Sequence, residues 1–175
     1  MAGVDPGDLY LLQQDLLSAI EEALDTIPDY FPSLDGAPAR SFVAPGRPAA
    51  DCCPQLTVNA VAVIEDQLGA AVPGRSVMTT RQNQVTLAVT LFRCAETEKP
   101  MPAQSELEAA AEQVSADGWA MWNHIFNMVR WGTFLTQCKE VKFGPLSQLP
   151  PEGGCVGWYW PIEVALDGYE ETLTS

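Results

Sequence analysis

The sequence predicts an α+β fold in which a mixed or antiparallel sheet of four to five strands carries two main helices packed on one face. Two long stretches have the apolar spacing of amphipathic helices, shorter stretches alternate in steps of two, and turn residues separate them. Short breaks between strands favour antiparallel or mixed pairing, which gives two layers around one core. With 175 residues and 47% hydrophobic residues, the chain is predicted to form a single domain, 1–175.

The first helix is predicted over residues 5–28. Asp5 is suited to cap it, Pro6 to occupy its first turn, and Asp8 to lie at the positive end of the helix dipole. Its apolar residues recur at spacings of three and four: Leu9, Leu12, Leu16, Ile20, Ala23 and Ile27.

Residues 29–54 read as an extended, proline-rich loop with one short extended piece, Arg40–Val43. A simple connection between two elements is much shorter than this. We therefore expect the segment to be functional surface or an ordered arm.

The rest of the chain, 55–168, is predicted to supply the sheet and a core helix over 105–130. Ser105 and Glu108 form a capping-box pattern at the start of that helix. The stretch 144–154 is rich in proline and glycine and is predicted to be a loop. Strands are expected at Gln55–Ile64, Gln84–Cys94, Gln137–Phe143 and Val156–Leu166, where β-prone residues alternate with polar or small ones.

Nine basic residues against twenty-three acidic ones give a formal charge of −14. Sequence-independent nucleic-acid binding depends on cations that neutralise phosphates, so this composition argues against it. An acidic surface repels a polyanion and keeps a protomer soluble before assembly. No apolar run is long enough to span a membrane, and the first residues do not resemble a secretory signal.

We predict no catalytic, cofactor-binding or metal-binding residues. The single histidine, His124, lies in the core helix without a nucleophile that the sequence places beside it, and a structural role is expected. Cys52 and Cys53 lack the paired spacing of zinc ligands, although a metal site with Cys155 or His124 is the alternative. Cys138 and Cys155 flank the 144–154 loop on adjacent predicted strands, which could bring them close, but no disulfide is predicted between them.

Aromatic residues gather in the second half of the chain, where some are expected to fill the core between the helix and the last strand. Those off the main apolar stripes, Trp131 and Tyr159, are candidates for a subunit interface, where aromatics are enriched. Two arginines in the proline-rich loop 29–54 and two at the break after the strand Gln55–Ile64 are candidates to pair with the carboxylates of a neighbouring copy. The alternative is that they are solvated. These arginines are Arg40, Arg47, Arg75 and Arg81.

Several stretches together resemble the tail terminators of long-tailed bacteriophages that infect actinobacteria. They are DCCPQLTV at 51–58, LFRC at 91–94, AMWN at 120–123 and PEGGCVGW at 151–158, within a layout that covers about residues 5–168. The resemblance implies a homo-oligomeric ring, a hexamer, that caps the tail tube and joins it to the head-to-tail connector. It also implies that genomic DNA passes through the lumen without specific binding. Such a protein is made in the host cytoplasm and resides in the tail or neck of the virion.

Two other functions remain open at this point. One is a head-to-tail connector or stopper of the phage neck, which we would expect to be closer to a β-barrel; the core helix favours the terminator. The other is a small-ligand-binding or enzymatic α+β domain that uses the Trp, Cys and His residues as a pocket. A bacterial protein of prophage origin with the same structural role is a further possibility.

Overall fold

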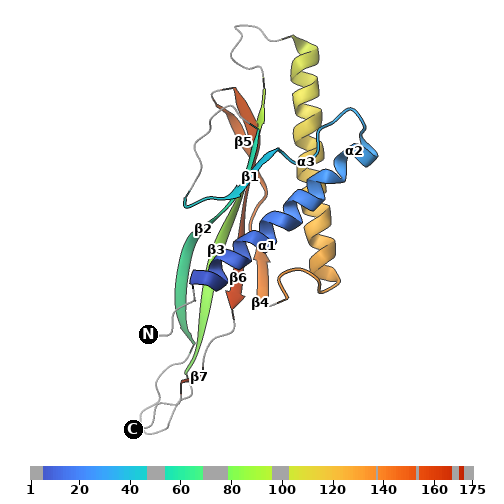
Figure 1. Cartoon of the computed structure of the whole chain (residues 1–175). Coiled ribbons are helices and arrows are strands. Elements are labelled where there is room, and N and C mark those ends of the chain that lie inside the picture. The colour runs from blue at the N-terminus through green and yellow to red at the C-terminus, as the bar shows by residue number, and fades with distance from the viewer. Residues whose placement is uncertain are drawn as a thin grey trace.

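The computed structural model of the chain describes residues 6–46, 54–68, 79–95, 103–136, 138–152, 154–166 and 170–171. The predicted α+β class, with a mixed sheet and two main helices, is confirmed (Figure 1). The elements are α1 (Pro6–Asp25), α2 (Ile27–Tyr30), β1 (Arg40–Val43), β2 (Gln55–Leu68), β3 (Thr79–Cys94), α3 (Gln104–Arg130), β4 (Cys138–Phe143), β5 (Ser147–Glu152), β6 (Cys155–Leu166) and β7 (Glu170–Glu171).

The sheet has the order β1-β2-β3-β6-β4, with β5 also on β6 and β7 on β3. β1 runs parallel to β2, and the other pairs are antiparallel. The predicted number of strands was too low, because the expected loop 144–154 contains β5. Its first residues pair with Gly157–Tyr159 of β6, and its prolines, Pro150 and Pro151, are tolerated because β5 lies at an edge.

β2 and β3 form a hairpin that extends past the body of the sheet (Figure 1). Their pairing runs from Gln55 opposite Phe92 to Leu68 opposite Thr80, with a bulge between Ala60 and Ala62. β6 accompanies β3 only as far as Asn83. Both predicted strands stop short of this extension, because polar residues interrupt the apolar alternation there while the backbone pairing continues.

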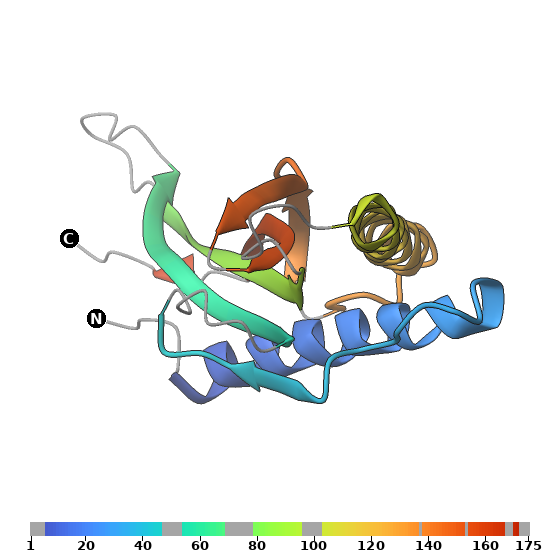
Figure 2. The same cartoon turned by 90° about the horizontal axis from the view of Figure 1, so that it is seen from above.

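Both main helices pack on the same face of the sheet. α1 crosses over β1 and β2, and α3 runs alongside β6 (Figures 1 and 2). The strand residues beneath them are those that the alternation places on one face, such as Val85, Leu87, Val89 and Leu91 of β3. The core is completed by fully buried residues of the helices and of β6: Leu16, Ile20, Leu24, Met121, Ile125, Trp160 and Ile162.

The helix starts differ in detail from the predictions. The N-cap residue of α3 is Ala103, two residues before the predicted cap Ser105. The Ala103 N–H donates to Glu106 Oε2 at 3.0 Å, so Glu106 takes the role predicted for Glu108. The predicted first helix, 5–28, is split at Thr26, whose hydroxyl donates to the Ala23 carbonyl at 2.7 Å. Asp5, its predicted cap, lies outside the described residues.

Candidate interaction surface

A buried ion pair joins the sheet to α3. Arg93 of β3 donates from Nε to Asp117 Oδ2 at 3.0 Å and from Nη2 to Asp117 Oδ1 at 2.7 Å, and both residues are almost inaccessible (6% and 0% exposed). Arg93 Nη2 also donates to the Gly36 carbonyl at 2.7 Å. A bidentate arginine with further hydrogen bonds meets the requirement that a buried charge be fully paired.

The same network holds the segment after α2 against α3. Gln113 Nε2 donates to Asp117 Oδ1 and to the Asp35 carbonyl, both at 3.0 Å, and its Oε1 accepts from the Asp35 N–H at 2.8 Å. This attachment leaves the rings of Tyr30 and Phe31 edge-on to Trp119, with centroids 5.6 and 6.5 Å away. The buried network therefore positions aromatic residues at the surface.

α3 and α2 together expose six aromatic side chains, here called the aromatic surface. Trp122 connects it to the core, because its ring contacts the buried Trp160 as well as Phe126 and Phe143. Single exposed apolar residues are common, but a group of this size typically marks a contact with another molecule. Its members are Tyr30, Phe31, Trp119, Trp122, Phe126 and Trp131, which are 40–74% exposed.

A groove of about 310 Å³ lies beside α3, between Tyr30, Trp119 and Trp131. Asn123, Asn127 and His124 also line it, and none of its described lining residues is a cysteine or a carboxylate. A second groove of about 260 Å³ lies between α1 and the residues that follow α3. The groove beside α3 thus offers stacking and hydrogen bonding, and Thr26 and Thr133 add two hydroxyl groups to its lining.

His124 lies between the helices. Its Nε2 is 3.9 Å from Glu22 Oε2 of α1 and makes no hydrogen bond among the described residues. This contact places His124 of α3 beside α1, and the structural role of His124 stays a prediction.

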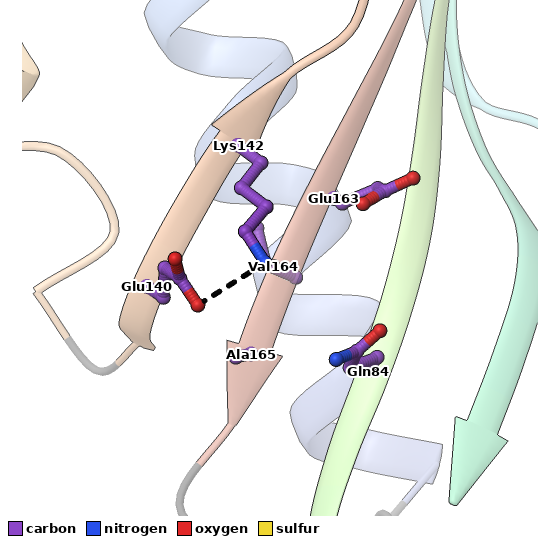
Figure 3. Close-up of a pocket in the computed structure, with 6 residues that line it drawn as sticks. All are labelled: Gln84, Glu140, Lys142, Glu163, Val164 and Ala165. Carbon is purple, nitrogen blue, oxygen red and sulfur yellow. Dashed lines mark ion pairs between the residues drawn. The ribbon is translucent and has the colours of Figure 1, made fainter. Parts of the chain in front are cut away.

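The hollow in Figure 3 lies near the C-terminal end of β6, on the sheet between β3 and β4. Lys142 is directed along β4 to Glu140, with Nζ 3.4 Å from Oε2, while Glu163 and Gln84 line the opposite side. The volume of about 10 Å³ is room for at most one water molecule. It is too small for a substrate, and the charged groups are a solvated surface pair.

Cys138 at the start of β4 is a poor nucleophile. Burial raises the pKa of its thiol to about 11, and the carboxylate of Asp15 contributes in the same direction. At pH 8 this lowers the thiolate fraction about 100-fold relative to an ordinary thiol. We expect the peptide that contains Cys138 to be alkylated by iodoacetamide far more slowly in the native chain than in urea, as followed by mass spectrometry. Equal rates would contradict this assignment.

Cys138 and Cys155 do not lie close, contrary to the prediction. Cys138 is opposite Leu166 at the last residue of β6, whereas Cys155 is its first residue and is opposite Cys94. The prediction failed because β5, and not β4, pairs with the first half of β6. Cys52 and Cys53 lie outside the described residues, and within the described ones no group of His, Cys, Asp and Glu is arranged to hold a metal.

The predicted interface residues lie on separate parts of the molecule. Trp131 belongs to the aromatic surface, and Arg130 lies over its ring at 5.8 Å. Tyr159 is half-buried on the face of the sheet that points away from the helices. Arg40 lies on β1 with its guanidinium 5.4 Å from the Phe42 ring. Arg81 lies in β3, and Arg47 and Arg75 fall outside the described residues.

No protein-family model matches the chain, and no curated protein matches it either. Among the described helices, none has both the length and the hydrophobicity needed to cross a membrane.

Proposed function

We propose that the chain is a structural subunit of a phage tail: a ring-forming tail terminator that caps the tail tube and joins it to the head-to-tail connector. In this proposal the copies form a hexamer in the virion, and DNA passes through the lumen without specific binding. The observation that carries the proposal is the aromatic surface, because a monomer in water gains nothing from exposing six aromatic side chains.

Two further features support a role in assembly. β2 exposes Val61, Val63 and Ile64, which form a second apolar region on a different element from the aromatic surface. Two different apolar regions on one chain suit head-to-tail contacts, which close into a ring when the rotation per copy allows it. The charge of −14 suits a lumen from which DNA is repelled.

The arrangement of layers supports a terminator over the stopper alternative. A 27-residue α3 and α1 cover one face of the sheet, whereas a stopper is expected to be closer to a barrel. The enzymatic alternative receives less support, because none of the described residues that line the groove beside α3 is a cysteine or a carboxylate.

The proposal is tested by measuring the mass of the purified chain by light scattering over a range of concentration and salt, with and without purified tail tubes. We expect a hexamer-sized species, or a monomer that becomes one on the tube ends. A chain that stays monomeric and does not bind tubes would exclude the terminator function.

Phe126→Glu tests the aromatic surface itself. A charge at this half-exposed position opposes desolvation in an interface, so we expect the concentration needed for assembly to rise at least tenfold. Ala109→Glu is the matched control, since it adds the same charge to an exposed position of the same helix. Both variants should keep the thermal stability of the wild type. Equal assembly of the two variants would show that the aromatic surface is not a contact.

A further inference from the structure

Among the described strands, one edge of the sheet is unpaired along most of its length. β1 covers β2 only from Gln55 to Val58, and no described strand pairs with the outer edge of β2 from Asn59 to Leu68. An open edge presents unpaired N–H and C=O groups, and soluble proteins usually protect such edges with charges or proline. Residues 59–64 read NAVAVI and contain neither, and the two charged residues of this edge, Glu65 and Asp66, follow them.

The side chains along this edge are also unusually apolar. Val61, Val63 and Ile64 are 50–56% exposed. Val63 is opposite the buried Val85 and lies on the helix side of the sheet, while Ile64 lies on the other side. A strand with β-branched residues exposed on both faces and an open backbone edge is suited to the addition of another strand.

The opposite edge of the same sheet supplies a fitting partner. β4 pairs only with β6, so no described strand occupies its outer edge either. Val141 and Phe143 of β4 are opposite core residues of β6, and Phe143 contacts Trp122 of the aromatic surface. A strand added to β4 would therefore lie next to the aromatic surface, where Val63 would find apolar neighbours.

Strand direction and charge both favour pairing between β2 of one copy and β4 of another. β4 is antiparallel to β6, β6 to β3 and β3 to β2, so β4 and β2 run in opposite directions within one copy. A second copy placed in the same orientation beside the first would present β2 antiparallel to β4. β2 contains two acidic and no basic residues, whereas β4 contains two lysines and one glutamate.

We propose that the open edge of β2, residues 59–66, pairs with β4 of a second copy of this chain, so that the sheets of neighbouring copies become continuous. This contact is heterologous and leaves both edges available at the ends of any open chain, as ring closure requires. It rests on the proposed function, because it specifies how the copies of the ring are joined.

The direction of the backbone groups identifies the residue to change. Ala44 N–H donates to the Val58 carbonyl at 2.9 Å, so the backbone groups of Val58 point away from β3. These groups alternate along a strand, and the bulge between Ala60 and Ala62 shifts the alternation by one residue. The N–H of Val63 therefore points outward, and a proline there removes a donor from the open edge without removing a β2–β3 hydrogen bond.

The experiment compares Val63→Pro with Val63→Thr in the full chain, using light scattering for mass and amide hydrogen exchange for pairing. Threonine keeps the N–H and the β-branch, so it should assemble within threefold of the wild-type concentration dependence. Proline should raise the required concentration at least tenfold. In the wild-type assembly, exchange should slow at least tenfold in both 59–66 and 138–143 relative to the monomer.

The outcomes separate this inference from the proposed function. A ring that forms equally with Val63→Pro, or without added protection of 59–66, overturns the strand pairing and leaves the ring intact. Protection of 59–66 without 138–143 also overturns it, because another segment then occupies the edge. Equal losses with proline and threonine would indicate a side-chain contact instead of backbone pairing. A wild-type chain that never assembles, with or without tubes, overturns the proposed function itself.

Discussion

Replacing Arg93 by methionine is expected to lower the free energy of unfolding by about 3–5 kcal/mol at pH 7. The change leaves the carboxylate of Asp117 fully buried without its guanidinium partner, while the Gly36 carbonyl loses its donor. Urea denaturation followed by tryptophan fluorescence measures the loss. Arg40→Met is the matched control: Arg40 is exposed on β1, so its replacement should cost less than about 1 kcal/mol.

The pH dependence gives this prediction a second test. Burial raises the pKa of Asp117, and the hydrogen bonds and charge of Arg93 oppose the rise. Without Arg93 the pKa rises further, so the folded variant retains a proton that the unfolded chain loses above about pH 4. Stability of the variant therefore falls as the pH rises, and its deficit relative to the wild type should shrink between pH 7 and pH 4.5. A deficit below 1 kcal/mol, or one independent of pH, would contradict the assigned role of the pair.

The fold was predictable where side-chain periodicity and burial coincide. The alternation at Val85–Leu91 and the helical spacing at Leu12–Ile20 both identify residues that are buried in the structure. Where backbone pairing continues without apolar alternation, the pattern gives no signal. This explains why the sequence did not predict the hairpin extension or β5, in which Leu149 stands between polar residues and prolines.

The surfaces were harder to predict, for a different reason. Trp119, Trp122 and Trp131 signal an aromatic region, but the sequence does not reveal which rings the fold leaves exposed. The buried ion pair could have been predicted from the sequence. Arg93 continues the core-facing alternation of Leu91, and Asp117 falls within the apolar stripe of α3. A charged residue at a core-facing position requires a partner, and two such residues of opposite charge indicate each other.

Replacing Gly157 by alanine should also be strongly destabilising, by about 3 kcal/mol, at the upper end of the usual cost of overpacking. Gly157 lies in β6 where β3 and β5 both approach it. A Cβ there would meet the carbonyl oxygen of Leu91 and lie 2.8 Å from its carbonyl carbon. Because these are backbone atoms of β3, no side-chain rotation relieves the contact, and the β3–β6 pairing must open.

Two other glycines show whether the effect comes from the close backbone approach. Gly46→Ala should be nearly neutral, since a Cβ at Gly46 meets nothing within 4 Å. Gly118→Ala should have an intermediate loss of stability, because its Cβ would lie 2.7 Å from the Trp158 ring. That ring is able to shift only by stretching the 2.7 Å hydrogen bond from Trp158 Nε1 to the Val114 carbonyl. Thermal and urea denaturation of the three variants should rank them in this order, with Gly157→Ala the least stable. A Gly157→Ala variant as stable as Gly46→Ala would mean that β3 and β6 are not paired in the register described, and β6 would then not place β4 at the far edge of the sheet.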